Sequence, residues 1–169
     1  IDDVGIGPES DSQILKLLYK FPKISCSILV KRENKPYLIN QVLPLLSIYS
    51  NPVYVHVNLL EGEMLTMTKN LFVNTPFAWV IRNFLPIGAR QIEIKKLVNE
   101  FEAQIKFIQL ALGKKELYGI DFHMNLHLLK SFEDIAEQLI RKFPNQKFRI
   151  SVEKFDIKLF RLIGMRYLK

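Results

Sequence analysis

The stretch from residue 117 to residue 153 constrains the fold most, because it reads as strand, helix and strand with almost no connecting chain. Residues 117–129 alternate between apolar and polar side chains, the pattern of a half-buried strand. Residues 132–143 carry apolar side chains at helical spacing, and Pro144 ends that helix. The alternation resumes over residues 147–153. Connections this short favour a right-handed crossover, and hence parallel pairing of the two strands.

A second strand–helix–strand unit spans residues 24–59. Alternation predicts strands over 24–30 and 53–59, and Pro36 suits the first turn of the helix between them. Pro44 is expected to kink or shorten that helix. We therefore expect an α/β fold, with a mixed α+β fold as the alternative. In both cases the prediction is a single-layer, mostly parallel or mixed sheet with helices packed on it.

The rest of the chain is predicted to supply a hairpin and further helices. Gly62 predicts a turn into a partner strand at residues 64–68. The longest helix is predicted over residues 89–112, with Gly113 as its C-terminal cap. Shorter helices are predicted over residues 10–21, 76–86 and 156–168.

Length and composition fit one globular domain over residues 10–169, because 169 residues of which 49% are hydrophobic can bury a sizeable core. Residues 1–9 hold two glycines, a proline and three acidic residues, and we expect a flexible leader there. The chain starts with Ile1 instead of Met, which suggests a domain or subunit of a larger protein or complex. One cysteine, Cys26, and no Asn-x-Ser/Thr sequence favour an intracellular location, cytoplasmic or nuclear. No apolar stretch is long enough to predict a membrane span.

The net charge of +7 is concentrated at the C-terminal end. Residues 141–169 hold nine Lys and Arg against Glu153 and Asp156, a difference equal to the net charge of the whole chain. Clusters of this kind can bind nucleic-acid phosphates, an acidic protein or an anionic surface. The alternative is a solvated face on a terminal helix that binds nothing. The candidate nucleic-acid or anion-binding residues are Lys147, Arg149, Lys154, Lys158, Arg161 and Arg166.

Two of the three histidines occur in one short pattern on two predicted strands, His56-x-Asn58-Leu59 and His123-x-Asn125-Leu126. The pattern resembles the two-histidine phosphoesterases, in which paired His-x-Ser/Thr motifs on adjacent strands face a nucleotide phosphodiester. The resemblance covers eight residues and implies His56 and His123 as candidate catalytic residues. Asparagine replaces both hydroxyl residues of the family motif, although an amide can also donate to a phosphate oxygen.

Acid–base chemistry by this pair requires both imidazoles to face one cleft. We expect a structure to place them on opposite faces of the sheet or more than about 10 Å apart, which would exclude it.

No metal or cofactor site is predicted. His123 and His127 would share one strand face, but residues four apart on a strand are separated by about 13 Å, too far for one ion. The chain has seven glycines and no Gly-rich phosphate-binding or dinucleotide-binding motif. The expectation is therefore a chain without a cofactor.

The first functional hypothesis is a non-catalytic protein-interaction or assembly module. Twelve phenylalanines and several long apolar stripes could exceed what one core needs, leaving a surface for a protein partner or for self-association. The alternative is RNA or DNA binding through the basic C-terminal region. A divergent two-histidine phosphoesterase-like enzyme is the third hypothesis. The sequence favours a non-enzyme without deciding the matter.

Overall fold

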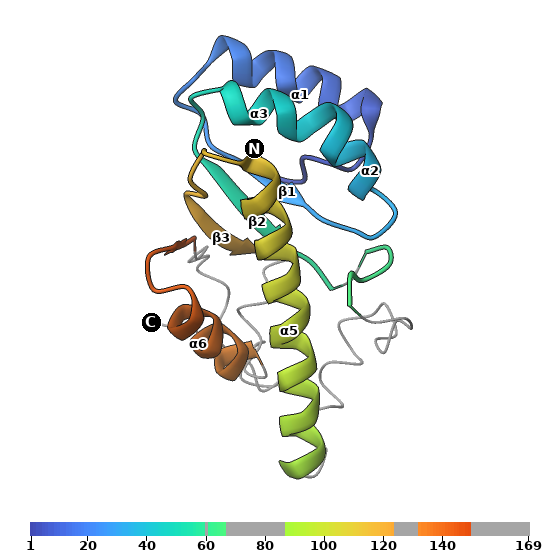
Figure 1. Cartoon of the computed structure of the whole chain (residues 1–169), viewed down its shortest axis with the longest axis vertical. Coiled ribbons are helices and arrows are strands. Elements are labelled where there is room, and N and C mark those ends of the chain that lie inside the picture. Colours follow the sequence, from blue (N-terminus) through green and yellow to red (C-terminus); the bar gives the residue numbers. More distant parts are fainter. Residues whose placement is uncertain (60, 67–86, 124–131, 150–169) are drawn as a thin grey trace, which may run out of the picture.

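Four parallel strands form one sheet with helices packed on it, which confirms the expected α/β class (Figure 1). The structure, a computed structural model, describes residues 1–59, 61–66, 87–123 and 132–149. The strands lie side by side in the order β1-β2-β3-β4, and every neighbouring pair is parallel, as predicted for both strand–helix–strand units. Their bounds are β1 Cys26–Leu29, β2 Val53–Val57, β3 Gly119–Phe122 and β4 Lys147–Phe148.

Helices precede each strand. Before β1 lies α1 Pro8–Lys20; before β2 lie α2 Lys35–Tyr37, the π-helical turn η1 Leu38–Val42 and α3 Leu43–Ile48; before β3 lies α5 Ile87–Leu112; and before β4 lies α6 Glu133–Lys142. The interruption predicted at Pro44 takes the form of the change from η1 to α3, where Pro44 occupies the first turn. Gly113 follows the last residue of α5 with φ +65°, the C-terminal cap that the sequence predicted.

The N-terminal residues are not the loose leader that their composition suggested. Val4 is fully buried and pairs in parallel with Ile28 of β1. The carbonyls of Ile1 and Val4 accept hydrogen bonds from the backbone N–H groups of Ser27 and Leu29, at 2.9 and 2.8 Å. The outer edge of β1 would otherwise leave backbone groups unpaired, and this segment satisfies them. Residues 1–4 therefore extend the sheet beyond β1.

The prediction of a hairpin at Gly62 is also wrong for the described part of the predicted partner strand, residues 64–66. Gly62 turns the chain with φ +68°, but residues 64–66 belong to no strand. The reason is that β1 and β3 already occupy both edges of β2, so no edge remains for an antiparallel partner. Residues 67–68 and the helices predicted over 76–86 and 156–168 lie outside the described residues.

The sheet has two chemically different faces. The strands lie in the sheet in the same order as in the chain. Because crossovers between parallel strands are right-handed, this order puts all the connecting helices on one face of the sheet. Paired residues share a face, and Ile28, Val55 and Ile120 are in register on the apolar one. Alternation puts the polar residues on the opposite face, namely Ser27, Tyr54, His56 and Asp121. The candidate site lies on this second face.

α5 and α6 complete the apolar core (Figure 1). Phe101 of α5 contacts Phe122 of β3, with ring centroids 5.9 Å apart, and Phe132 at the start of α6, at 6.4 Å. α6 buries Ile135 and Leu139 in the same core, the face that the sequence predicted. None of the described helices combines the length and the apolar character needed to cross a membrane.

Replacing Leu139 with alanine should destabilise the protein by about 2–5 kcal/mol, because the side chain is fully buried and its loss leaves a cavity. The matched control is Glu137→Ala on the exposed side of α6, which should cost less than about 0.5 kcal/mol even though Glu137 pairs with Arg141 at 2.6 Å. Urea unfolding curves measure both. Similar losses for the two variants would show that α6 faces the core with a different side.

Candidate metal centre

Three potential metal ligands converge at the carboxyl ends of the parallel strands. His56 lies near the end of β2, His123 directly follows β3, and Asp3 lies on the N-terminal segment beside β1. Their ligand atoms all lie within 4.8 Å of one another. Both histidines are buried, with 6% and 4% of their surface exposed, whereas Asp3 is partly exposed. The carboxyl ends of the strands are where α/β sheets generally hold their sites.

The Asp3 carboxylate is shared between the two imidazoles. Its Oδ1 lies 3.3 Å from His56 Nε2 and 3.1 Å from His123 Nδ1. Two ligand atoms bound to a tetrahedral ion at about 2.05 Å are separated by about 3.3 Å. The imidazole rings meet nearly at a right angle, with centroids 5.0 Å apart. The two distances from Asp3 match this separation, and the ligand atoms of all three residues lie within 4.8 Å of one another. Two histidines with one carboxylate form a donor set that catalytic zinc and iron sites use.

Each histidine presents its other nitrogen to a second carboxylate. His56 Nδ1 lies 2.6 Å from Oδ1 of the buried Asp121, and His123 Nε2 lies 3.3 Å from Glu61 Oε1. Metal-binding histidines nearly always donate their second N–H to such a partner, which fixes the tautomer and the ring orientation. The site thus contains the outer partners of a metal centre as well as the three ligands.

The electrostatic balance around the histidines is negative. Arg149 forms ion pairs with both Asp2 and Asp121, and Lys31 pairs with Glu61 at 3.1 Å. With Asp3 there are four carboxylates against two cations in this cluster of described residues. With the two imidazoles left out of the count, the carboxylates exceed the cations by two, which is the charge that one divalent cation compensates.

Two of the carboxylates are exposed enough to exchange protons with solvent and have lowered pKa values. Burial alone would raise the pKa of Asp2, but hydrogen bonds from Arg149 and Ser27 outweigh it and hold that pKa below its ordinary value. For Glu61, burial is likewise outweighed by Lys31 and His123, and the pKa is lowered. Both groups are therefore ionised at neutral pH and can accept a proton.

The backbone at Asp3 has an unusual conformation. Its φ of +62° is the left-handed region, and among the described residues it is the one non-glycine position with positive φ. With this backbone conformation, the side chains of two adjacent residues both contact the polar face of the sheet. Asp2 accepts a hydrogen bond from Ser27 Oγ at 2.9 Å, and Asp3 lies beside both histidines. Both carboxylate oxygens of Asp11 accept the Gly5 N–H at 3.0 Å and so hold the turn that follows. Strained residues held in this way are concentrated at functional sites.

The expected separation of the two histidines is wrong. His56 is in register with Asp121, two residues before His123, so alternation puts both imidazoles on the same face at 5.0 Å. Asn58 of the first motif holds its own turn, donating from Nδ2 to the Glu61 carbonyl and accepting the Glu61 N–H at Oδ1. Asn125 and His127 lie outside the described residues.

The predicted basic surface is described at two positions. Arg149 lies at the site and not on an open basic surface, because Asp2 and Asp121 both pair with it. Lys147 is exposed and donates to the Tyr118 hydroxyl at 2.7 Å, with its ammonium 4.1 Å from the centre of that ring. The other candidates lie outside the described residues: Lys154, Lys158, Arg161 and Arg166.

Sequence reasoning missed the acidic half of the site. Metal ligands were sought along one strand, whereas His56 and His123 come from two neighbouring strands and Asp3 from the expected leader. The sequence contains two signals: the adjacent acids Asp2 and Asp3 shortly before Gly5, and Asp121, which alternation puts on the same face of its strand as His123.

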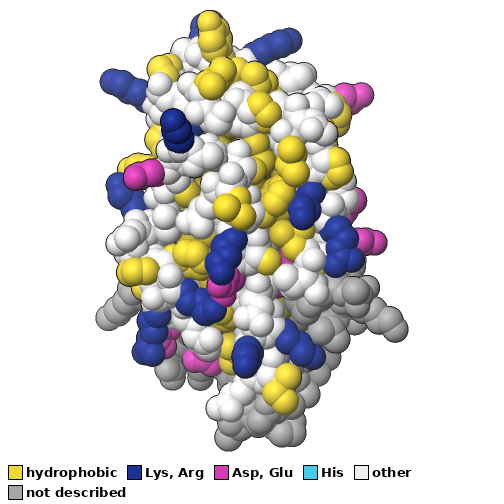
Figure 2. All heavy atoms as spheres, viewed as in Figure 1, with side chains coloured by type: hydrophobic (Ala, Val, Ile, Leu, Met, Phe, Trp, Pro, Cys, Tyr) yellow, Lys and Arg dark blue, Asp and Glu magenta, His cyan; other side chains and the backbone are white. Residues whose placement is uncertain are grey.

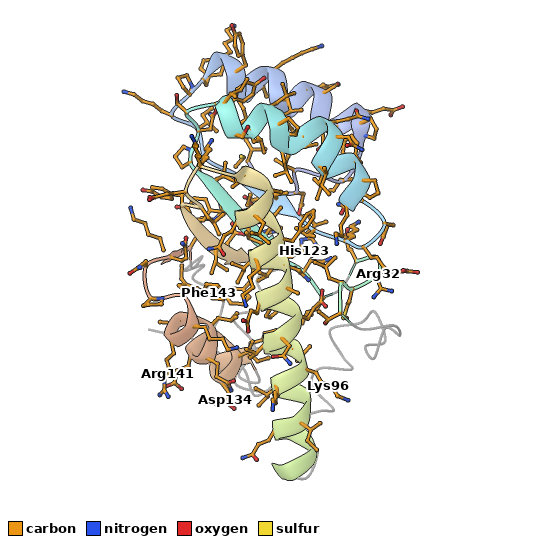
Figure 3. The ribbon with its side chains drawn as sticks, viewed as in Figure 1. Arg32, Lys96, His123, Asp134, Arg141 and Phe143 are labelled. Carbon is orange, nitrogen blue, oxygen red and sulfur yellow. The ribbon has the colours of Figure 1, made fainter. Side chains whose placement is uncertain are left out.

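A hollow of about 610 Å³ lies between α5 and α6. Its described lining carries both signs of charge, from Lys95, Glu137 and Arg141 among others, and contains no histidine or cysteine. Figure 3 shows Asp134 and Arg141 on α6 well away from His123, which lies at the level of the sheet. The hollow is therefore separate from the cluster of metal ligands.

Comparisons of this chain with protein-family models, curated proteins and solved structures find no match.

Proposed function

We propose that the protein is a hydrolase whose catalytic group is a divalent metal ion bound by Asp3, His56 and His123. The observation that carries this proposal is the convergence of three ligand atoms within 4.8 Å, with a further carboxylate behind each histidine. Three protein ligands leave a coordination position for water, and a bound divalent ion makes that water acidic enough to supply hydroxide near neutral pH.

The surrounding residues have distinct roles in this proposal. Asp121 and Glu61 accept the outer N–H of His56 and His123, which leaves the inner nitrogens free to bind the ion. Arg149 holds Asp121 in place through their ion pair. Asp2 and Glu61 are partly exposed carboxylates beside the proposed ion, held by Arg149 and Lys31 respectively.

Metal-free acid–base chemistry by the histidine pair has less support. A general acid or base needs a ring nitrogen directed at the substrate. All four ring nitrogens of His56 and His123 lie within 3.3 Å of a carboxylate oxygen, on Asp3, Asp121 or Glu61. In a metal centre, one nitrogen of each histidine would bind the ion and the other would donate to its carboxylate partner. An acid–base pair would need a ring nitrogen directed at the substrate, and each of the four nitrogens faces a carboxylate instead.

Chelation and reconstitution test the proposal. Carboxylate and phosphate esters with a nitrophenol leaving group serve as probes, before and after removal of metal with EDTA. We expect hydrolysis to be lost on chelation and restored by Zn²⁺, and to stay absent in Zn²⁺-loaded His123→Ala. Hydrolysis that survives chelation but requires both histidines would favour the acid–base alternative. A Zn²⁺-loaded protein that hydrolyses none of the probes would contradict the proposal for these ester classes.

A second role, docking on another protein, is supported by the outer surface of α1 and α3. Tyr19 and Ile48 are each 76% exposed, and Leu17 and Phe21 lie nearby in sequence with 46% and 44% exposed. Tyr19 contacts Tyr49 at 5.8 Å, so the ends of the two helices form one surface. Figure 2 shows hydrophobic side chains at this end of the molecule.

Light scattering tests this second role. A wild-type dimer that becomes a monomer when Tyr19 and Ile48 are both replaced with serine would support it. A monomeric wild type would count against self-association.

A further inference from the structure

A completely buried carboxylate on α5 accepts hydrogen bonds from the loop that follows β2. Glu100 has no exposed surface. Its Oε1 accepts the Leu65 N–H at 2.8 Å, and its Oε2 accepts the Thr66 N–H at 2.7 Å and the Thr66 hydroxyl at 2.6 Å. Burying a carboxylate costs stability unless hydrogen bonds satisfy it, and here loop donors satisfy both oxygens. Helix packing alone would be served better by an apolar residue at this position.

One turn later on the same face of α5, Gln104 holds the other end of that loop. Its Oε1 accepts the Asn58 N–H at 2.9 Å and its Nε2 donates to the Asn58 carbonyl at 2.7 Å. The same Nε2 also donates to Glu100 Oε1 at 2.8 Å, so the two side chains form one buried unit. We call the described residues 58, 59 and 61–66 the β2 loop. Glu100 and Gln104 clamp both of its ends to α5.

The β2 loop carries the carboxylate that faces His123. Between its clamped ends, Asn58 makes two hydrogen bonds with the backbone of Glu61, at 2.6 and 3.1 Å. The Glu61 side chain then reaches His123 Nε2 with Oε1 and Lys31 with Oε2. Glu61 is partly exposed, so packing does little to fix it. Its position relative to His123 therefore depends on the loop backbone. That backbone is held by α5 at both ends and by Arg32 and Glu33 at Glu63, whose carbonyl accepts the Arg32 N–H at 2.8 Å and whose N–H donates to Glu33 Oε2 at 3.0 Å.

We propose that Glu100 and Gln104 are positioning residues of the metal centre. They fix the β2 loop so that Glu61 orients His123 for metal binding. The role in metal binding rests on the proposed function above; the orientation of His123 by Glu61 does not. Within the described part of the chain, Glu100 and Gln104 form no hydrogen bond or ion pair with the metal ligands, and in this proposal they act through the β2 loop that carries Glu61.

A double-mutant cycle tests the proposal in the full chain. Zn²⁺ affinity is measured by competition with a chromogenic chelator for wild type, Glu100→Gln, Glu61→Gln and the double variant, at a temperature where each is folded. Loss of an outer partner of a metal-binding histidine weakens binding by about 10–100-fold, and we expect this for Glu61→Gln. Glu100→Gln should weaken binding by about 10-fold alone, and by less than about 2-fold when Glu61→Gln is already present.

The matched control is Glu102→Gln, two residues along the same helix. Glu102 pairs at the surface with Lys106 and Lys142 and forms no hydrogen bond or ion pair with the loop within the described residues. The same charge change should therefore leave Zn²⁺ affinity within about 2-fold. A purely structural role would lower the melting temperature of Glu100→Gln without any dependence on Glu61. Losses that multiply in the double variant, or an unchanged affinity in Glu100→Gln, would overturn the proposal.

A second readout separates this inference from the proposed function. The ring ¹⁵N chemical shifts of His123 in the metal-free protein report its contact with Glu61 whether or not the protein binds metal. Glu100→Gln should move these shifts toward the values of Glu61→Gln, and Glu102→Gln should not. Moved shifts in a protein that binds no Zn²⁺ would keep the positioning role and reject the metal centre. Unmoved shifts would reject the positioning role itself.

Discussion

Replacing Asp3 with asparagine should weaken Zn²⁺ binding by more than about 100-fold, beyond the range expected for loss of an outer partner. Among the described residues, Asp3 is the one carboxylate that lies within 3.3 Å of both histidines, and a neutral amide oxygen is a much weaker ligand. Competition with a chelator measures the change. The control is Asp2→Asn, which removes the neighbouring charge but none of the three converging ligands and should keep affinity within about 10-fold.

The same Asp3 variant should remain folded, and its metal-free form should melt no lower than the wild type. Asparagine tolerates the left-handed φ of +62° at least as well as aspartate. The substitution also removes one of four carboxylates from a cluster that holds an excess of negative charge without metal. Functional sites often carry residues that reduce stability, so replacing such a residue can remove function without lowering stability. A clear loss of melting temperature would instead indicate a structural role for Asp3.

Replacing Gly5 with alanine should destabilise the fold by about 3 kcal/mol or more, combining backbone strain with a steric clash. Gly5 has φ +106°, a conformation that side chains rarely allow. A Cβ there would lie 2.8 Å from Leu38 Cδ2 and 2.9 Å from the Leu29 carbonyl oxygen, and that backbone atom cannot move cheaply. The Gly5 N–H also donates a hydrogen bond to the Asp11 carboxylate. A displacement of the Gly5 backbone would therefore disturb the turn next to Asp3.

The matched control for this substitution is Gly7→Ala. Gly7 has extended backbone with φ 172°, and a Cβ there meets nothing within 4 Å. Its replacement should change the free energy of unfolding by less than about 1 kcal/mol in either direction. Urea unfolding measures both variants. Equal losses for the two glycines would mean that the turn after Asp3 is not held as tightly as these contacts imply.

The strands and their directions follow from local pattern and connection length. Alternation over 53–57 and 119–122 marks both central strands, and the short segments around α6 dictate parallel pairing with β4. The N-terminal segment was misjudged because acids and glycines suggest a solvated leader. Its one buried apolar residue, Val4, is too weak a pattern to reveal a strand pairing on the edge of β1.

The site was harder to predict than the fold, because it depends on register between strands. Periodicity places His56 and His123 on faces of their own strands, but only the pairing of His56 with Asp121 puts both on one face. Arg149 shows the same limit: it belongs to a basic run in the sequence, yet its partners Asp2 and Asp121 come from the other end of the chain and from β3. Such contacts arise from the assembled sheet, and no local pattern contains them.

Titration of the metal-free protein with Co²⁺ tests the metal centre most directly, because the visible absorption of that ion reports the number and geometry of its ligands. The account predicts saturation at one equivalent, bands of the intensity typical of four- or five-coordinate Co²⁺, displacement by Zn²⁺, and loss of the signal in Asp3→Asn and in His56→Ala. Absorption that never saturates, or that is unchanged when Asp3 and His56 are replaced, would contradict a metal centre at Asp3, His56 and His123.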